Sequence, residues 1–163
     1  MPGPTPQPFR NAVCGVPGPR EELVETCGLD GFELRALEVI RLILAGMAGP
    51  LPRYAPDVAQ VAQAQFGWAR SDAILAGLTA LVQTMSVSRR DPFPYSNPFC
   101  PGCSRVLTQG EGQLLRVLHH ARRGQQGRAM AYALLLCEAR PVTALLDVAG
   151  DLASLVPPGA DPR

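Results

Sequence analysis

Two cysteines in a C-x-x-C arrangement are the strongest candidate for chemistry in this sequence. Cys100 and Cys103 are separated by Pro101 and Gly102, which favour a tight turn. At this spacing both thiolates can reach one tetrahedral metal ion from a single loop. A structural zinc site takes four ligands, so this pair needs two more.

A second cysteine-bearing loop can supply the two missing ligands. The phrase that ends at Cys100 has the frame Pro, aromatic, any, Asn, any, any, Cys, and the same frame ends at Cys14. Each copy precedes another cysteine, Cys27 or Cys103, and then a helix. We therefore predict a structural zinc site with four ligands: Cys14, Cys27, Cys100 and Cys103. Twelve residues separate Cys14 from Cys27 whereas two separate Cys100 from Cys103, which leaves open whether the four thiols meet.

A redox dithiol is an alternative use of Cys100 and Cys103. In the thioredoxin arrangement such a pair opens a helix, whose N-terminus lowers the pKa of the first thiol. Here Thr108 is the predicted N-cap of the next helix, and no βαβ pattern surrounds the pair. Loop cysteines without a shared task are the simplest interpretation. Cys137 lies inside an apolar helical run and is expected to be a core residue.

A basic helical face is the second candidate site. On a helix that begins after Thr108, the side opposite the leucines carries two Arg and two His residues: Arg116, His119, His120 and Arg123. The basic face over residues 116–128 can bind phosphate groups or an acidic partner. It contains no aromatic residue for base stacking, so a solvated surface is the simpler interpretation. The two histidines are also alternative metal ligands beside Cys100 and Cys103.

The composition gives no support to several classes of function. The formal net charge is +1, so no global charge points to nucleic acid or to an anionic membrane. All 15 basic residues are Arg, which a GC-rich genome explains. The sequence lacks nucleophile-elbow, P-loop, dinucleotide-binding and HExxH patterns, so an enzyme is not indicated and no cofactor beyond zinc is expected.

The chain carries no pattern of a secreted or membrane-spanning protein. Its N-terminus lacks a basic start followed by an apolar run. Its longest apolar stretches fall short of the roughly 20 residues that a membrane helix needs. We therefore expect a cytoplasmic protein, in which thiols stay reduced and bind metal more readily than they form disulfides.

The elements that must position these residues are predicted to be helices. Apolar spacing and capping residues indicate about six main helices and no strand, over residues 30–45, 57–66, 71–85, 108–123, 128–139 and 141–155. A short helix is also expected over residues 20–25. The predicted fold is all-α and forms one domain over residues 1–163. It comprises an extended Pro-rich arm (1–19), a first helical half (20–85), a linker with the C-x-x-C (86–104) and a second helical half (105–157).

The two halves are predicted to be pseudo-repeats of a three-helix unit. Asp30 with Glu33, and Thr108 with Glu111, form capping-box patterns. The helices that follow align without gaps at an offset of 78 residues. Together with the repeated cysteine phrase, this alignment predicts an internal duplication whose halves pack about a pseudo-twofold axis.

These observations favour a non-catalytic cytoplasmic interaction or regulatory protein with a structural zinc ion. The helix over residues 30–45 is apolar around most of its circumference, so it belongs in the core or at an interface. The expected partner is an unknown protein or a second copy of the chain. One alternative is a nucleic-acid-associated regulator that uses the basic face over residues 116–128. Another is a thiol redox protein that uses Cys100 and Cys103.

Overall fold

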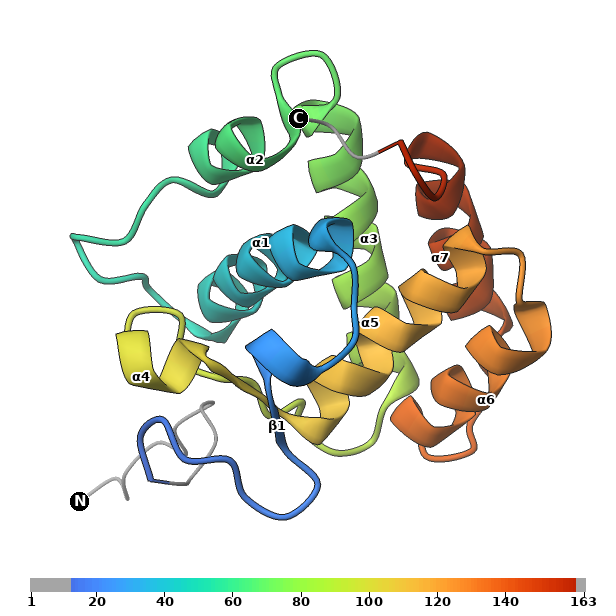
Figure 1. Cartoon of the computed structure of the whole chain (residues 1–163), viewed down its shortest axis with the longest axis horizontal. Coiled ribbons are helices and arrows are strands. Elements are labelled where there is room, and N and C mark those ends of the chain that lie inside the picture. The colour runs from blue at the N-terminus through green and yellow to red at the C-terminus, as the bar shows by residue number, and fades with distance from the viewer. Residues whose placement is uncertain (1–12, 161–163) are drawn as a thin grey trace.

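Helices dominate the described part of the chain. The computed structural model describes residues 13–160, and residues 1–12 of the predicted arm lie outside it. Six long helices and one short helix, α4, follow one another within residues 13–160 (Figure 1): α1 (Gly31–Ala48), α2 (Val58–Phe66), α3 (Ser71–Ser88), α4 (Pro101–Ser104), α5 (Gln109–Arg122), α6 (Gln126–Leu136) and α7 (Thr143–Leu155). This confirms the predicted all-α fold with about six main helices.

Within residues 13–160 the structure contains two very short strands, so the expectation of no strand was wrong to that extent. One of them lies where a helix was predicted, over residues 20–25. β1 (Glu22–Leu23) pairs antiparallel with β2 (Val106–Leu107), and a 3₁₀ turn, η1 (Val24–Thr26), follows β1. The partner of β1 lies far along the chain, so a local pattern cannot reveal it. Arg20 also has a φ of 66°, a conformation that does not start a right-handed helix.

Capping residues define the starts of α1 and α5. Asp30 accepts hydrogen bonds from the backbone N–H groups of Phe32 (3.1 Å) and Glu33 (3.2 Å), and Glu33 accepts one from the Asp30 N–H (3.1 Å). Thr108 and Glu111 make the same reciprocal pair, with distances of 3.1 and 2.9 Å. Both predicted capping boxes are confirmed.

Other helix boundaries differ from the predicted ones by a few residues. α1 continues past Gly46, and Ser71 is the first residue of α3 rather than its N-cap. α6 stops at Leu136 because Glu138 and Ala139 both adopt a positive φ. The predicted linker over residues 86–104 contains a helical turn, α4.

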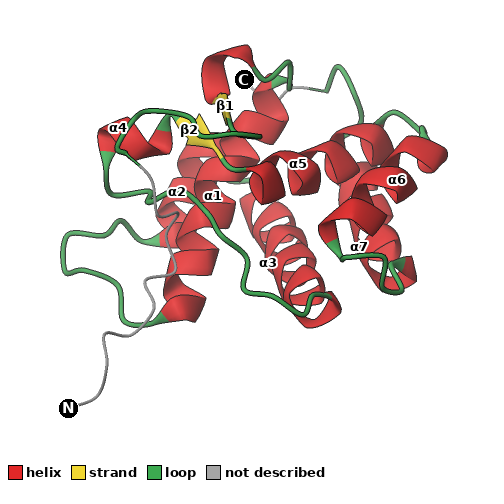
Figure 2. Ribbon diagram, turned by 90° about the horizontal axis from the view of Figure 1, so that it is seen from below, coloured by secondary structure: helices red, strands yellow, loops and turns green. Residues whose placement is uncertain are grey.

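By chain order the long helices form two groups of three, which also pack closely against each other. α1, α2 and α3 pack on one another, and so do α5, α6 and α7 (Figures 1 and 2). Between the groups, α1 contacts α5 and α3 contacts α7. At the second contact a Cβ on Gly77 would lie 2.8 Å from Cδ1 of Leu152, so a larger residue there would make the Leu152 side chain shift. A duplicated unit would pack in this way, but the duplication itself stays a prediction.

One hydrophobic core joins both groups. Its largest fully buried side chains include Phe32, Ile40, Phe66, Ile74, Leu78, Leu81, Met85, Leu114, Leu115, Leu118 and Leu136. Trp68 lies outside this core and is 82% exposed. Phe66 fills the core position at the end of α2, and the chain turns at Gly67, where φ is 77°. Within residues 13–160, no helix combines the length and the apolar character needed to cross a membrane.

Candidate metal centre

Three of the four predicted cysteine ligands meet at one place in the structure. The sulfur atoms of Cys14, Cys100 and Cys103 all lie within 4.8 Å of one another. Sγ of Cys14 is 3.1 Å from Sγ of Cys100, although 86 residues separate them. Cys14 is exposed and the other two are half-buried, so the thiol cluster lies at the surface. In Figure 1 the first described residues (blue) pass beside α4 (yellow).

Cys27, the fourth predicted ligand, does not join the thiol cluster. Its Sγ donates a hydrogen bond to the backbone oxygen of Val24 (3.1 Å), within the turn of η1. Cys27 is buried and belongs to the hydrophobic core. The 3₁₀ turn after β1 directs this side chain inward, and the strand pairing that produces the turn has no local sequence pattern.

The loop around Cys100 is folded by its own side chains. The Asn97 Oδ1 atom accepts a hydrogen bond from the Phe99 N–H (2.9 Å) and closes a turn before Cys100. Cys100 is the N-cap of α4, and its Sγ accepts a hydrogen bond from the Cys103 N–H (3.4 Å). Pro101 follows at the start of the helix, where its missing N–H is not needed. One short turn therefore holds both cysteines of the C-x-x-C pair.

Two glycines let the segment that carries Cys14 approach α4 closely. Gly15 has a φ of 73°, in the region that favours glycine, and its Cβ position lies 3.5 Å from the backbone oxygen of Gly102. A Cβ on Gly102 would lie 2.7 Å from Sγ of Cys14, which is closer than real contacts. The present position of the Cys14 sulfur therefore depends on the absence of a side chain at Gly102.

A buried ion pair holds both ends of the C-x-x-C loop. Nε of Arg41 on α1 lies 2.7 Å from Oε1 of Glu111 on α5, and the two side chains are 4% and 0% exposed. Arg41 also donates to the backbone oxygens of Ser104 (2.7 Å) and Val106 (2.8 Å), after the second cysteine. Glu111 accepts from the Ser96 N–H (3.1 Å), before the first cysteine. The loop is thus fixed to both central helices.

Hydrogen bonds within the thiol cluster separate the acidities of two cysteines. The Cys103 side chain, the Cys103 backbone N–H and the Cys14 side chain all hydrogen-bond to Cys100 and lower its pKa to about 7. The hydrogen bond to Cys100, together with desolvation, raises the pKa of Cys103 to about 12. Cys100 is therefore the more acidic of these two thiols, and Cys103 holds its proton more tightly. A bound metal ion would displace the Cys103 proton.

Three cysteine sulfurs form a donor set for a thiophilic metal ion. Thiolates select ions such as Zn²⁺ and Cu⁺ over Mg²⁺ and Ca²⁺. Among residues 13–160 no His, Asp or Glu joins the thiol cluster, and residues 1–12 contain no Cys, His, Asp or Glu. The cluster therefore supplies three ligands and leaves a fourth tetrahedral position for water, a small ligand or a partner's side chain.

The four residues of the predicted basic face have partners within the protein. These pairs are Arg116 with Glu22 (2.7 Å), His119 with Glu33 (3.4 Å), His120 with Gln125 (2.6 Å) and Arg123 with Asp30 (3.0 Å). His120 also stacks on the Tyr132 ring. Acidic groups of other elements balance the two arginines, which weakens their attraction for phosphate. His119 lies with carboxylates, not in the thiol cluster.

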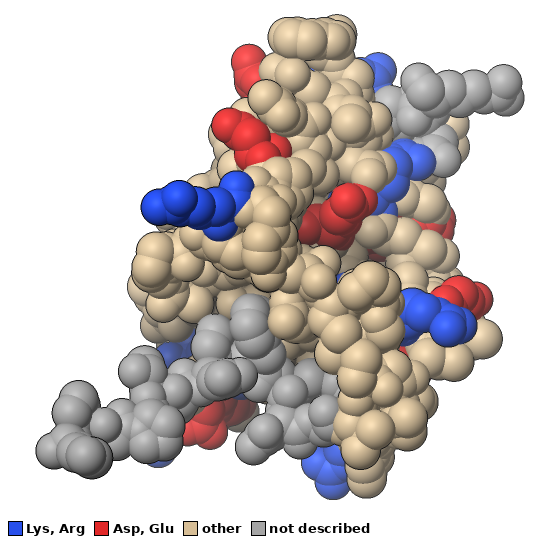
Figure 3. All heavy atoms as spheres, turned by 90° about the vertical axis from the view of Figure 1, so that its left-hand side faces the viewer, with Lys and Arg blue, Asp and Glu red and all other residues tan. Residues whose placement is uncertain are grey.

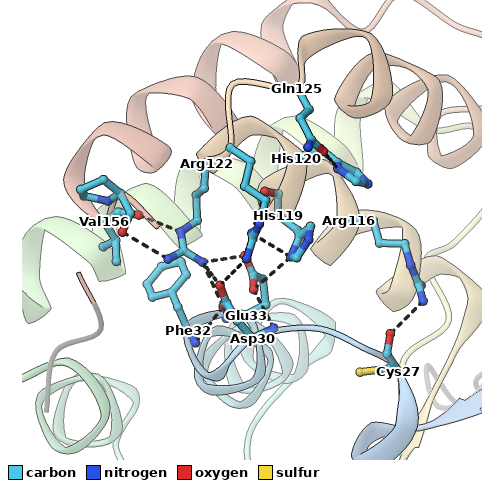
Figure 4. Close-up of polar contacts among 12 residues, drawn as sticks. Cys27, Asp30, Phe32, Glu33, Arg116, His119, His120, Arg122, Gln125 and Val156 are labelled. Carbon is cyan, nitrogen blue, oxygen red and sulfur yellow. Dashed lines mark hydrogen bonds and ion pairs between the residues drawn. The ribbon is translucent and has the colours of Figure 1, made fainter. Parts of the chain in front are cut away.

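Arg122 stands at the centre of a buried polar cluster (Figure 4), which the sequence did not indicate. Its Nη1 donates to Asp30 (2.9 Å) and Glu33 (2.7 Å), and its Nε donates to the backbone oxygen of Val156 (2.7 Å). Ligand atoms of Asp30, Glu33 and His119 lie within 4.8 Å of one another. The guanidinium already supplies the positive charge between the two carboxylates. We therefore assign this cluster to joining the start of α1, the end of α5 and the chain after α7.

Burial changes the titration of this polar cluster. Desolvation and the hydrogen bond to Asp30 raise the pKa of Glu33 to about 7. Burial opposes the ionisation of Asp30, but hydrogen bonds to Glu33 and Arg123 hold the pKa of Asp30 well below its usual range. Burial and the neighbouring Arg123 lower the pKa of His119. Glu33 therefore gains or loses its proton near neutral pH.

The surface beside the thiol cluster shows no large patch of one charge. Figure 3 shows the side of the molecule that lies to the left in Figure 1, where Arg and acidic side chains are scattered among uncharged residues. No protein-family model, curated protein or solved structure matches the chain. The thiol cluster is therefore the feature from which a function can be argued.

Proposed function

We propose that the chain is a non-catalytic zinc-binding protein in which Cys14, Cys100 and Cys103 hold one Zn²⁺. The observation that carries the proposal is the convergence of three thiols from two distant segments within 4.8 Å. Zinc–sulfur bonds of about 2.3 Å at tetrahedral angles put neighbouring sulfurs about 3.8 Å apart. The sulfurs need small movements to reach this spacing.

The proposed role of the ion is to fasten the N-terminal segment to the helical core. None of the residues from 13 to 20 is buried, so this segment has little apolar packing of its own. Cys14 lies in it, whereas Cys100 and Cys103 belong to a loop that Arg41 and Glu111 hold rigidly. Zinc binding would supply the stabilising free energy that the segment does not gain from burial.

A structural and regulatory role fits this site better than hydrolysis. Within residues 13–160, the group of possible ligand atoms around this site consists of sulfurs alone, without a His, Asp or Glu to serve as a general base. All five cysteines are free thiols, which suits a reducing compartment such as the cytoplasm. We propose that the protein acts by binding a protein partner, for which the exposed Trp68 and Tyr54 offer aromatic contacts.

Elemental analysis of protein purified without added metal tests the zinc site. We expect about one zinc ion per chain, and close to none after Cys14→Ser or Cys100→Ser. Cys27→Ser is the matched control, because Cys27 is a free thiol outside the thiol cluster and its replacement should leave zinc in place. A wild-type chain that neither carries zinc nor takes it up on titration would refute the proposal. Loss of zinc in Cys27→Ser would instead support the four-cysteine site that the sequence predicts.

A further inference from the structure

The thiol cluster contains a pair of sulfurs that is already close to bonding distance. Sγ of Cys14 and Sγ of Cys100 lie 3.1 Å apart. A disulfide needs a separation of about 2.05 Å, so the two sulfurs must approach by roughly 1 Å. Cys14 belongs to a segment without buried residues between 13 and 20, which can make this movement while the C-x-x-C loop stays in place.

Cys100 has the properties of a thiol that reacts with peroxide. It is half-exposed, its sulfur accepts a hydrogen bond from the Cys103 N–H (3.4 Å), and the sulfur of Cys14 lies 3.1 Å away. Hydrogen bonds to a thiolate favour that form. Thiolates rather than thiols attack peroxides, and redox-sensing cysteines are accessible and lie beside a second, resolving cysteine. Cys14 occupies the place of a resolving cysteine.

We infer that Cys100 and Cys14 form a redox-sensitive pair, in which a peroxide oxidises Cys100 and Cys14 resolves the product to a disulfide between residues 14 and 100. The Cys100 thiolate attacks one oxygen of hydrogen peroxide, the O–O bond breaks, and hydroxide leaves with Cys100 as the sulfenic acid. The Cys14 sulfur then attacks the Cys100 sulfur. The S–O bond breaks and water leaves with the Cys14 proton.

Cys103 is the competing partner, and its geometry places it second. Its backbone N–H donates a hydrogen bond to the Cys100 sulfur (3.4 Å) within the turn of α4, whereas the sulfur of Cys14 already lies 3.1 Å from that of Cys100. Cys103 therefore helps to hold Cys100 in place, while Cys14 supplies the second sulfur of the bond.

The disulfide would also regulate the site proposed for zinc, and this part of the inference rests on the proposed function. The bond consumes two of the three ligand sulfurs, so oxidation should release the ion. In the opposite direction, bound zinc should protect Cys100 from peroxide, because its sulfur is engaged with the metal. The formation of the disulfide in metal-free protein does not depend on zinc binding.

Peptide mapping tests the pairing directly. Metal-free, reduced protein is treated with an equimolar amount of hydrogen peroxide, its remaining thiols are blocked, and it is digested with trypsin. Cleavage after arginine yields a peptide over residues 11–20 with Cys14 and a peptide over residues 91–105 with Cys100 and Cys103. We expect these two peptides to be cross-linked. An unlinked 91–105 peptide that has lost two hydrogens would contain the Cys100–Cys103 disulfide instead and would overturn the inference.

Single substitutions separate the roles of the three thiols. Cys103→Ser should still give the cross-link, because it keeps the backbone N–H that donates to Cys100. Cys14→Ser should accumulate a sulfenic acid at Cys100, detected by a dimedone-type probe. Cys137→Ser, at a buried core position, is the control and should behave like the wild type. Absence of the cross-link in both the wild type and Cys103→Ser would refute the pairing.

Zinc titration of the same samples distinguishes the two proposals. If the cross-link forms but the chain binds no zinc, the redox pair stands and the proposed zinc site fails. If the chain binds zinc but forms no cross-link in its metal-free state, the zinc site stands and the redox pair fails. If both occur, peroxide should release zinc from the wild type, as measured with a colorimetric zinc chelator.

Discussion

Arg41 on α1 and Glu111 on α5 form a buried ion pair of 2.7 Å, and the same two helices bring a histidine and a second glutamate together. At the predicted offset of 78 residues, Glu33 is equivalent to Glu111 and His119 is equivalent to Arg41. Nδ1 of His119 lies 3.4 Å from Oε2 of Glu33. The basic residue of each helix thus faces the capping-box glutamate of the other. This reciprocity gives the predicted duplication a geometric counterpart without establishing it.

Arg41→Met should destabilise the protein strongly. It leaves Glu111 buried without its positive partner and removes the donor to the Ser104 and Val106 backbone oxygens. Breaking a buried pair in this way costs about 3–5 kcal/mol of the free energy of unfolding. Urea denaturation followed by circular dichroism measures this loss. Zinc affinity should fall as well, because the C-x-x-C loop loses its attachment to α1.

Arg105→Met is the matched control for this prediction. Arg105 also lies 2.7 Å from a glutamate, Glu25, but these side chains are 63% and 50% exposed. Solvent screens such a pair, so we expect a far smaller loss of stability. Equal losses in the two variants would contradict a special role for the buried pair.

Gly102→Ala should weaken zinc binding without removing any thiol. The added Cβ would lie 2.7 Å from Sγ of Cys14, so that sulfur must move away from the other two. Changes to groups that orient metal ligands lower metal affinity by about 10–100-fold, and we expect a loss in this range. Competition with a zinc chelator measures it. The rate at which peroxide cross-links Cys14 to Cys100 should fall too.

Gly46→Ala controls for the general effect of replacing a glycine. Gly46 lies within α1, and a Cβ there meets no other atom within 4 Å. Alanine has the higher helix propensity, so stability should stay the same or rise slightly, and zinc affinity should not change. If Gly102→Ala also left zinc affinity unchanged, the close contact with Cys14 would have no bearing on the site.

Deprotonation of Glu33 should make the free energy of unfolding fall as pH rises through neutrality. Its pKa is raised to about 7 in the folded protein from an ordinary value of 4.5, so between these values the folded chain binds a proton that the unfolded chain lacks. The stabilising contribution is complete below pH 4.5 and is lost as pH rises through 7. His119 acts in the opposite direction, because its lowered pKa destabilises the folded state on acidification below about 6.5. Asp30 stays ionised across this window.

Comparison with Glu33→Gln isolates the Glu33 contribution. Gln can keep the capping contact with Asp30 but cannot titrate. Between pH 5 and pH 8 the wild type should lose about 1–3 kcal/mol of stability relative to this variant, as measured by urea denaturation at each pH. A constant difference, or one that grows with pH, would show that Glu33 is an ordinary ionised partner of Arg122.

The fluorescence of Trp68 should reflect its contact with solvent in the native protein and should reveal little about unfolding. It is the single tryptophan of the chain and is 82% exposed. Its fluorescence in the native protein should already resemble that of tryptophan in water, should be quenched readily by acrylamide, and should shift little on unfolding. Trp68→Ala should change stability by no more than about 0.5 kcal/mol. A blue-shifted native emission that is resistant to acrylamide would mean that another surface covers Trp68.

Local patterns were sufficient to predict the six long helices, although not the short α4. Asp30 and Thr108 were assigned as N-caps from their residue types and from the glutamate three positions later, and both capping boxes are present. Helical spacing of apolar residues likewise identified the six main helices. These features depend on neighbours within one or two turns, so they are visible in the sequence.

Contacts between distant segments account for the features that the sequence did not reveal. Arg41 is a residue type that is seldom buried alone, but its partner Glu111, on another helix, lies with it in the interior. Cys27 was grouped with the other thiols, but the pairing of β1 with β2 and the turn that follows bury it. Arg122 had no sequence pattern, since its partners Asp30 and Glu33 lie about 90 residues earlier in the chain.

The approach of Cys14 to Cys100 also has a topological consequence. Residues 14–100 contain α1, α2 and α3, whereas α5, α6 and α7 lie beyond Cys100. One bond between the two sulfurs would close the first group of helices into a covalent ring and leave the second group as a linear tail. Oxidation would then restrict the unfolded conformations of one group and not of the other. The two groups share one core in the reduced protein. After oxidation they would differ in how extended each can become on unfolding.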